Sequence, residues 1–504
     1  MISKVNSIVP HGFGGALVEV EGSKTRSLSQ FNIVGLASKT INESRERVRN
    51  AIRASGFAFP SDSRITINLA PAELNKDGPH LDLPIALSVM ILSNQLHQKD
   101  VDNAIFVGEL SLEGLLRPVR GIINVVEAAK NLNYKTVYLP IQNVPQASLV
   151  DDIKIIGVDS LKQLILILKS QISPPANHLG ESLNSPKCPS SAPTLDQIRG
   201  QERAKRALEI AVAGHHNLLL NGPPGAGKTM LARTATSLLP PLSRAEKISI
   251  TKIHGLSNSN CEIIASRPFR SPHHTASTVS IIGGGNHAFP GEISLAHLGV
   301  LYLDEFPEFP RSVLEALRQP LEDKVISISR ANTKVTYPAD FMLIATMNPC
   351  PCGHLGDPFH QCTCTPQQIE NYKKRISGPL LDRIDIYLDV SPVETSSLLN
   401  QAASSSPSVQ NVVKNNITEA VERQFNRYHN KETRNSNLSS TEVASLLSLK
   451  PSAKATLDIA TKSLGLSARS YFKVIKVAQT IADLERAPEI SDSHISESLS
   501  FRKR

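Results

Sequence analysis

The chain has 504 residues, of which 40% are hydrophobic and 20% charged, and its formal net charge is +8. This composition is ordinary for a soluble globular protein, and the length predicts two to four domains. The longest apolar run, at 164–168, is far shorter than the roughly 18 residues needed to span a bilayer. The first residues show no apolar signal segment. We therefore expect a cytoplasmic protein, whose positive charge permits a nucleic-acid partner without establishing one.

Residues 1–172 alternate strand-like and helix-like segments, which predicts a self-contained α+β or α/β domain. Residues 64–71 alternate apolar and polar side chains as a strand does, and residues 83–96 have the length and apolar spacing of a helix. Residues 135–140 form another short β pattern. Residues 173–194 collect Pro, Ser, Asn and Gly without periodicity, which is typical of a linker.

Residues 195–393 predict an α/β domain with a parallel sheet covered on both faces, because strand and helix patterns alternate there. A second polar stretch, at 394–416, predicts a partly disordered or loosely packed connection. We expect residues 394–504 as a whole to form a helical domain, since segments such as 467–485 are apolar at helical spacing.

A glycine-rich turn joins a strand pattern to a helix pattern within residues 218–235. The spacing is that of a P-loop, in which backbone N–H groups and the positive end of a helix hold phosphates. Lys228 is expected to reach the β- and γ-phosphates of ATP, and Thr229 to bind Mg²⁺. The residues of this expected site are Gly222, Pro223, Pro224, Gly225, Ala226, Gly227, Lys228 and Thr229.

Two acidic residues, Asp304 and Glu305, directly follow the apolar strand pattern at 299–303. Such a pair is often only a solvated strand end. Downstream of a P-loop, however, Asp304 is placed to hold Mg²⁺ and Glu305 to act as general base on the attacking water. Asn348 ends the next buried strand pattern, where its amide would orient that water; the alternative is a turn-forming asparagine.

Four of the six cysteines follow Asn348 in two Cys-x-Cys pairs: Cys350, Cys352, Cys362 and Cys364. Because cytoplasmic thiols stay reduced, such a cluster holds metal more often than disulfides. Four thiolates would complete the tetrahedral coordination of a structural Zn²⁺, with His354 and His360 as substitutes or bystanders. The alternatives are four ordinary buried thiols or a redox disulfide.

Two short alternating strands, 325–330 and 333–338, predict a β-hairpin joined by an Ala-Asn turn. Arg330 and Lys334 at its tip would suit the backbone phosphates of DNA in a pore. A charged hairpin is as often a plain solvated edge. The segment 267–299, which begins with Arg267, adds three further candidates for DNA contact: Arg270, His273 and His274.

The order of these motifs resembles that of AAA+ ATPases. Asn348 then stands where the family has its first sensor residue. The segment 377–390 resembles the one that supplies an arginine finger, with Arg383 as first choice and Arg375 as runner-up. In such enzymes the finger acts on ATP held by the neighbouring subunit, so the resemblance implies a ring, expected to be a hexamer. For both arginines the plain alternative is a structural pair with a carboxylate.

Two further segments extend the resemblance to AAA+ ATPases. Residues 464–478 resemble the helix of the second sensor, with Arg469 facing the phosphates, although an arginine at a helix start is usually a surface residue. Residues 195–211 resemble the segment that packs near adenine, which makes Ile198 and Gly200 expected base contacts. The expected catalytic residues are thus Glu305, Asn348, Arg383 and Arg469.

Longer motifs narrow the family. The stretches PGEISLAHLGVLYLDE, LRQPLED, MNPCPCG and RISGPLLDRIDI resemble the magnesium-chelatase-like AAA+ proteins of the YifB/ComM family, and the resemblance covers essentially the whole chain. It implies an ATP- and Mg²⁺-dependent ring motor on single-stranded or branched DNA, a helicase or branch-migration enzyme in recombination of transforming DNA. The alternative is a magnesium-chelatase-type subunit that remodels a protein or metal-insertion complex.

Residues 68–90 and 108–140 resemble the proteolytic domain of Lon. The resemblance implies a ribosomal S5 domain 2-like α+β domain, followed by the P-loop AAA+ core and its helical lid. A Ser-Lys dyad would need a serine after the Gly-Pro turn and a lysine in the later helix. His80 stands at the serine's place, and residues 122–125 contain no lysine. We therefore expect a Lon-like domain without protease activity; an ATP-dependent protease is the least favoured alternative.

Overall fold

The computed structural model describes residues 2–35, 39–74, 76, 78–175, 193–257, 262–285, 288–330, 333–356, 360–391, 408–430 and 433–502. The predicted linker lies almost wholly outside these residues, as does most of the polar stretch predicted at 394–416. The last part of that stretch is not loose. Helix α16 (Val409–Tyr428) begins there, because Val413, Ile417 and Ala420 share one helical face and pack into the central core.

Residues 2–175 form an α+β unit around a four-stranded sheet of order β1-β2-β4-β3. The strands are β1 (Ile2–His11), β2 (Gly14–Arg26), β3 (Gln30–Val34) and β4 (Ser63–Ala70). β4 alternates buried and more exposed residues, as the sequence predicts. The predicted helix, α2 (Asp82–Leu92), is buried along its whole length, which accounts for its continuous apolar sequence.

A second, parallel sheet of order β5-β8-β9 completes this unit. The remaining elements are α1 (Lys39–Ala54), β5 (Ala104–Phe106), β6 (Glu109–Leu110), β7 (Leu116–Arg117), α3 (Ile122–Asn131), β8 (Thr136–Pro140), α4 (Val144–Ala147), β9 (Lys154–Val158) and α5 (Leu161–Leu168).

The central part is a parallel sheet of order β11-β14-β17-β10-β18. Its strands are β10 (Leu218–Asn221), β11 (Phe269–Arg270), β14 (Val300–Leu303), β17 (Met342–Met347) and β18 (Ile386–Asp389). Successive residues enter two different cores: Leu218 and Leu220 pack with α6 (Glu202–Gly214) and α7 (Lys228–Leu238), whereas Leu219 joins the core on the other face. The prediction of a parallel sheet covered on both faces is confirmed.

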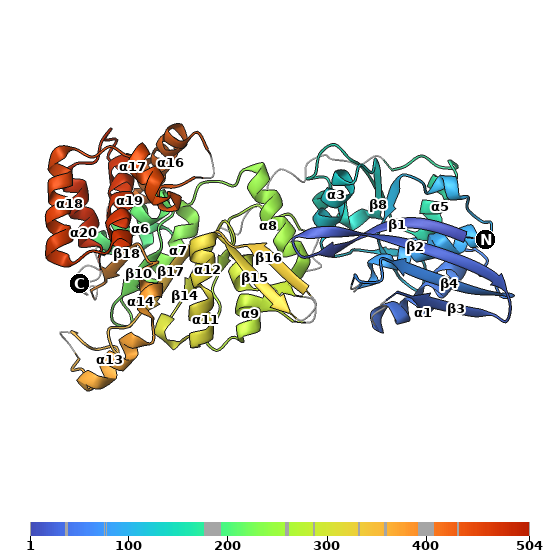
Figure 1. The fold of residues 1–504 in the computed structure, drawn as a ribbon, viewed down its shortest axis with the longest axis horizontal. Coiled ribbons are helices and arrows are strands. Elements are labelled where there is room, and N and C mark those ends of the chain that lie inside the picture. The colour runs from blue at the N-terminus through green and yellow to red at the C-terminus, as the bar shows by residue number, and fades with distance from the viewer. Residues whose placement is uncertain are drawn as a thin grey trace.

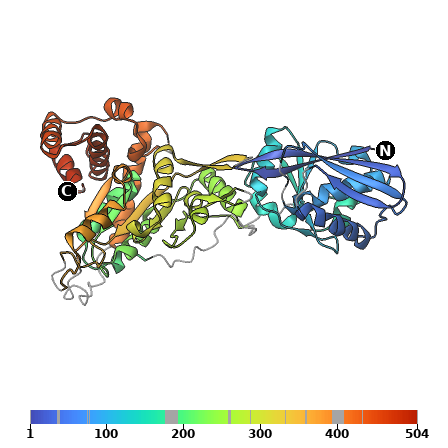
Figure 2. The same ribbon diagram turned by 60° about the horizontal axis from the view of Figure 1, so that its bottom comes forward.

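The second face is covered by short helices and by the predicted hairpin, β15 (Val325–Arg330) with β16 (Thr333–Pro338). Figure 2 shows the yellow hairpin running from the central part toward the blue N-terminal strands. The other elements of the central part are α8 (Arg244–Ser257), α9 (Thr278–Ile282), β12 (Gly283–Gly284), β13 (Phe289–Pro290), α10 (Glu292–Leu295), α11 (Arg311–Ala316), α12 (Arg318–Asp323), α13 (Pro366–Lys374) and α14 (Gly378–Leu381).

The C-terminal part is helical, as predicted, and comprises α16, α17 (Ser440–Leu446), α18 (Pro451–Leu464), α19 (Ala468–Leu484) and α20 (Asp492–Ser500). The three parts follow one another along the long axis of the molecule (Figure 1). Among the described helices, none combines the length and apolar character needed to cross a membrane.

Helix α8 joins the central part to the N-terminal part. Lys252 forms an ion pair with Glu127, and its ammonium lies 4.1 Å from the ring centre of Phe13 at the β1–β2 turn. The backbone N–H of Gly121 donates to the carbonyl of Gly255 at 2.8 Å. These contacts combine charge, cation–π and backbone interactions, so the two parts are held in a defined orientation.

Candidate active site

Three neighbouring strands end side by side at the carboxyl edge of the central sheet. In the parallel register Asn221 of β10 lies opposite Met347 of β17, and Leu303 of β14 lies opposite Ala345. The residues that follow these strands are Gly222, Asn348 and Asp304. The sheet therefore brings together three motifs that are far apart in the sequence, at the edge where open α/β sheets bind ligands.

The turn between β10 and α7 is shaped to receive phosphate. Gly225 and Gly227 have φ values of +79° and +82°, in the left-handed region that favours glycine, and a Cβ on either would meet no atom within 4 Å. Helix α7 begins at Lys228. Its first turn adds unpaired N–H groups and the positive end of the helix dipole, so the backbone forms an anion cradle.

Lys228 closes this cradle. Its Nζ lies 3.1 Å from the carbonyl oxygen of Pro223 and 3.0 Å from Oδ1 of Asn348, and it also donates to the carbonyl of Gly222. Burial lowers the pKa of Lys228 to about 8, against the opposing effect of two nearby carboxylates. A phosphate in the cradle would favour the charged form.

Asp304 lies among hydroxyl groups suited to a hydrated magnesium ion. Its Oδ1 accepts hydrogen bonds from Oγ1 of Thr346 and from the backbone N–H of Glu305. The Tyr302 hydroxyl donates to Oγ1 of Thr229 at 3.2 Å, and burial raises the pKa of Tyr302 to about 12, which keeps its proton. The Asp304 carboxylate and the Thr229 hydroxyl are the hard oxygen ligands that Mg²⁺ prefers.

Tyr302 and Thr346 were missed by the sequence reasoning. Both belong to buried strands, where a polar atom is usually satisfied within the core. The period of two along a strand is the signal that would have found Tyr302, because residues 302 and 304 point to the same side.

Glu305 is exposed to solvent beside Asp304. Its side chain is 52% exposed, and its backbone has a φ of +51°. Its Oε2 lies 3.5 Å from Nδ1 of His274, whose ring is 4.2 Å from that of His273. A water-accessible carboxylate beside a candidate magnesium site suits a general base. His274, a candidate for DNA contact in the sequence, therefore lies beside the residue expected to act as general base.

The segment before α6 lies against the phosphate-binding turn. Ile198 is buried in the central core, and Gly200 has a φ of +61°. Gln201, which the sequence did not single out, donates through Nε2 to the carbonyls of Ala226 at 3.5 Å and Ser391 at 2.6 Å. Gln201 thus links this segment to the turn that would hold phosphate.

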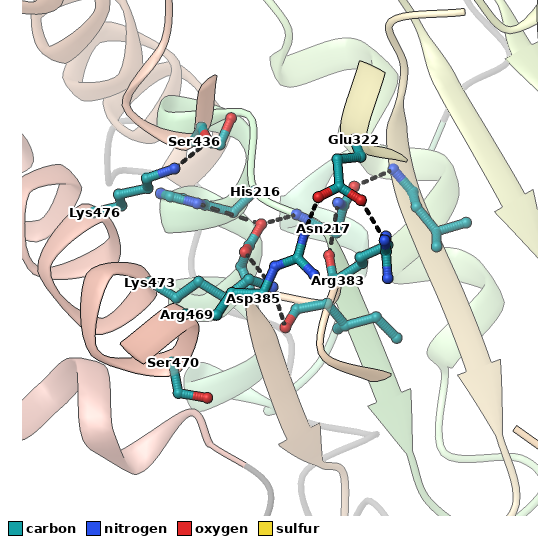
Figure 3. A network of polar contacts seen from close by, with 12 residues as sticks. His216, Asn217, Glu322, Arg383, Asp385, Ser436, Arg469, Ser470, Lys473 and Lys476 are labelled. Carbon is teal, nitrogen blue, oxygen red and sulfur yellow. Dashed lines mark hydrogen bonds and ion pairs between the residues drawn. The ribbon is translucent and has the colours of Figure 1, made fainter. Parts of the chain in front are cut away.

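Arg383 and Arg469 lie at the opposite, amino-terminal edge of the sheet (Figure 3). The backbone carbonyl of Arg383 accepts a hydrogen bond from Asn217, the residue before β10 begins. Both side chains bind the same carboxylate: Arg383 contacts Oε2 of Glu322, and Arg469 contacts Oε1. The sequence predicts that Arg469 faces the phosphates, whereas in the single chain it lies beside Arg383.

The position of Arg469 follows from an anchor one turn further along α19. Lys473 lies 3.0 Å from the largely buried carboxylate of Asp385, which also accepts from the backbone N–H of Asn217 at 3.0 Å. Burial alone would raise the pKa of Asp385, but Lys473 and His216 hold it well below its usual range. This buried charge pair fixes the start of α19 to the amino-terminal edge.

Arg375, the runner-up for the finger, lies on the phosphate-binding side of the sheet. Its Nη1 is 2.5 Å from Oε2 of Glu308, in the turn that follows Glu305. Tyr372, in helix α13 just before Arg375, is hydrogen-bonded to the backbone of Asn348. The two arginines therefore serve different edges, and Arg383 lies at the edge far from its own phosphate-binding turn.

The four cysteines after Asn348 converge on one point. The Sγ of Cys350 is 3.4 Å from that of Cys352 and 3.6 Å from that of Cys362, and all four sulfurs lie within 4.8 Å of one another. Thiolates around a tetrahedral Zn²⁺ are about 3.8 Å apart, so the group fits that ion. All four thiols are free. The rings of His354 and His360 lie 4.9 Å apart and are tilted by 37°, and neither histidine belongs to the group of converging ligand atoms.

The candidate DNA contacts have different surroundings. Arg270 binds both carboxylate oxygens of Glu292 at 2.6 Å, and Arg267 is largely buried against Glu246. Both arginines are thus engaged within the chain. Lys334 on the hairpin is exposed, whereas the side chain of Arg330 lies outside the described residues.

In the N-terminal part, the place expected for a protease nucleophile holds a buried histidine. Nε2 of His80 lies 2.9 Å from the carbonyl of Arg120, and burial lowers the pKa of His80. Lys76 is fully buried and donates to the carbonyls of Gly35 and Leu74. These partners are those of structural side chains that shape a turn.

Matches to known proteins cover nearly the whole chain. Family models described as magnesium chelatase, subunit ChlI; subunit ChlI of Mg-chelatase; and magnesium chelatase, subunit ChlI C-terminal match residues 194–398, 18–143 and 408–502, respectively. The chain is 40% identical over 499 residues to the protein YifB of Salmonella typhimurium, covering 97% of this chain and 95% of that protein.

Two other relatives match over different lengths of the chain. The competence protein ComM of Haemophilus influenzae is 40% identical over 494 residues, covering 97% of this chain and 95% of ComM. Lon protease 2 of Bacillus subtilis is 33% identical over 181 residues, which is 32% of each chain.

Proposed function

Because the chain belongs to the YifB/ComM family of magnesium-chelatase-like AAA+ ATPases, we propose that it is an ATP-hydrolysing ring motor that acts on DNA. The observation that carries the proposal is the split between two edges of one sheet. Lys228 and Asp304 lie at the carboxyl edge, and Arg383 and Arg469 at the amino edge. Strand β10 alone separates the edges by about 13 Å, so these arginines suit ATP held by the next copy in a head-to-tail ring.

In this proposal each residue at the carboxyl edge has one task. Lys228 and the glycine turn bind the phosphates, while Thr229 and Asp304 would hold Mg²⁺, which would supply positive charge beside the terminal phosphate. Glu305 orients and deprotonates the attacking water, and the amide of Asn348 is the second hydrogen-bond partner of that water. Arg383 and Arg469 of a neighbouring copy stabilise the charge that develops on the transferred phosphate. Ile198 and Gly200 contact the base.

Three observations support DNA as the substrate and a role like that of the relative ComM in competence. The hairpin projects from the central part and carries the exposed Lys334. The net charge of +8 favours a polyanionic partner. The full-length likeness to a competence protein fits recombination of incoming DNA. We therefore propose a hexamer that unwinds or branch-migrates DNA in the cytoplasm, with domains at 1–172, 195–393 and 394–504.

The test measures ATP hydrolysis with and without forked DNA, followed by branch migration of a labelled junction. We expect DNA to stimulate ATP hydrolysis. We expect the junction to migrate only when ATP is present. Lys228→Ala abolishes ATP binding. Glu305→Gln keeps ATP binding but lowers turnover by about 10²-fold or more. If the protein hydrolyses ATP but no DNA structure changes the rate, the result would instead favour a magnesium-chelatase-type subunit that remodels a protein complex.

We also propose that the four cysteines hold a structural Zn²⁺ that braces the active site. The sulfur distances support the ion, and the loop touches the site on two sides. Cys350 is two residues from Asn348, and a Cβ on Gly353 would lie 2.9 Å from Cδ of Pro224 in the phosphate-binding turn. A closed set of four thiolates leaves no position for chemistry, so the role is structural.

Metal analysis tests this site directly. Protein purified without chelator should contain about one zinc per chain, and Cys362→Ser should lose it and unfold at lower temperature. Ser257→Ala, a change at a half-buried residue of α8 outside the loop, serves as the control. Metal-free protein with four titratable thiols and unchanged stability would contradict the proposal.

A further inference from the structure

One carboxylate holds both arginines of the amino-terminal edge (Figure 3). Glu322 in α12 binds Arg383 through one oxygen and Arg469 through the other. Arg383 comes from the segment before β18, and Arg469 from the first turn of α19. The contact therefore joins three elements that only the tertiary fold brings together.

Arg383 is folded back on its own chain. Besides binding Glu322, it donates through Nη1 to the carbonyl of Pro379 at 2.7 Å, and only 14% of its side chain is exposed. Arg469 and Glu322 are 44% and 46% exposed. The guanidinium of Arg383 must therefore leave this carboxylate before it can contact a phosphate on another chain.

Glu322 has the chemistry of a competing anion. Its partial burial would raise its pKa, but the hydrogen bonds and charges of Arg383 and Arg469 lower it, so the carboxylate is ionised at neutral pH. Carboxylates and phosphates both accept the planar, forked donors of a guanidinium. Partly exposed ion pairs are weak and exchange readily, so a phosphate with more charge can displace this one.

We propose that Glu322 is an internal stand-in for the phosphate, which holds Arg383 and Arg469 in the unassembled chain and releases them when ATP on a neighbouring copy competes. The inference rests on the proposed ring and adds a regulatory residue to it. In this way Glu322 couples ring assembly to ATP binding. The two arginines pass from the carboxylate of Glu322 to the phosphate of ATP and are not left exposed.

The test compares Glu322→Gln, which removes the charge and keeps the shape, with Asp323→Asn, a change at the neighbouring exposed carboxylate of the same helix. With ATP present, the Gln variant should form rings at several-fold lower protein concentration than wild type, as measured by sedimentation. Its ATPase rate at low protein concentration should rise, with a lower KM for ATP. Adding Arg383→Ala should abolish both gains, and Asp323→Asn should behave as wild type.

Other outcomes overturn the inference in recognisable ways. If Glu322→Gln forms rings only at unchanged or higher concentration, Glu322 does not hold the arginines back. If kcat falls while KM stays the same, Glu322 positions the arginines within the assembled site instead. Thermal unfolding and a second variant, Glu322→Ala, show whether a loss reflects misfolding. If wild-type ATPase per chain is independent of protein concentration, the ring proposal itself fails.

Discussion

The ammonium group of Lys228 is largely shielded from water. It donates hydrogen bonds to the carbonyl oxygens of Gly222 and Pro223 and to the amide oxygen of Asn348. These neutral acceptors compensate only partly for the loss of solvation, so its pKa falls from 10.5 to about 8. A bound phosphate would add negative charge to that of the two nearby carboxylates, Asp304 and Glu305. The nucleotide-free site therefore keeps a lysine whose charge depends on pH near the neutral range.

We expect the affinity for ATP to fall as the pH rises above about 8. Free Lys228 then loses its proton, and binding has to restore it; below that pH it is already charged, and the affinity changes little through this group. The fall approaches about tenfold per pH unit. Titration with a fluorescent ATP analogue measures it. Lys228→Arg, which stays charged, should give a flat profile; an equal fall in this variant would assign the effect to another group.

The hydroxyl of Tyr302 donates a hydrogen bond to Thr229, the residue proposed to bind Mg²⁺. We expect Tyr302→Phe to raise the Mg²⁺ concentration for half-maximal ATPase activity by roughly tenfold, because partners of metal ligands tune affinity on that scale. The matched control is Tyr337→Phe, at a buried hydroxyl that donates to Ala288 instead. Equal Mg²⁺ requirements for the two variants would refute the role of Tyr302.

At the scale of elements, the hairpin β15–β16 has one face in the protein core and the other face toward solvent. Ile326, Ile328, Val335 and Tyr337 are buried and point to the core below the sheet. The alternate residues face outward, and Lys334 is exposed among them. A Cβ on Gly12 of the N-terminal part would lie 2.9 Å from Val335, so the hairpin also contacts that part. Its orientation is therefore set by contacts at both ends.

We expect Lys334→Ala to weaken DNA binding and to flatten its salt dependence, with a stronger effect when Arg330→Ala is added. Each phosphate contact contributes about 0.9 to the slope of log affinity against log salt. A filter-binding salt titration measures both quantities. Lys454→Ala, on the exposed face of α18, removes the same charge far from the hairpin and should change neither. If Lys334→Ala and Lys454→Ala have the same DNA affinity and the same salt dependence, the hairpin does not contact DNA.

The whole molecule places its candidate catalytic groups at two opposite edges of the central sheet. Lys228 and Asp304 follow the carboxyl ends of strands, while Arg383 precedes β18 and Arg469 begins α19. The N-terminal part is held to α8 and to the hairpin. Movement of the central part on ATP binding would therefore be transmitted to the N-terminal part as well.

Mixing two inactive variants tests this arrangement. Lys228→Ala cannot bind ATP but keeps its arginines, and Arg383→Ala binds ATP but lacks the finger. In an equal mixture roughly a quarter of the interfaces combine the intact halves, so ATPase activity should return to about that level. Each variant alone should stay inactive. A mixture with no recovered activity, although mixed rings form, would place Arg383 outside the neighbouring site.

The sequence alone determined the local features of this protein. The glycine turn at 222–229, the acidic pair 304–305 and the alternating strands of the hairpin depend on short spacing and backbone geometry, so a single stretch of chain reveals them. The parallel sheet and the helical C-terminal part also follow from such periodicities.

Only the tertiary structure decided which distant residues meet. Pairing of parallel strands placed Tyr302 and Thr346 beside Thr229 and Asp304, the proposed ligands of Mg²⁺, and the convergence of the four cysteines depends on how their loop closes. The charge pair between Lys473 and Asp385 holds the start of α19 so that Arg469 lies at the amino edge, beside Glu322. These contacts join segments whose separation along the chain carries no signal, because packing and charge pairing depend on distance in space.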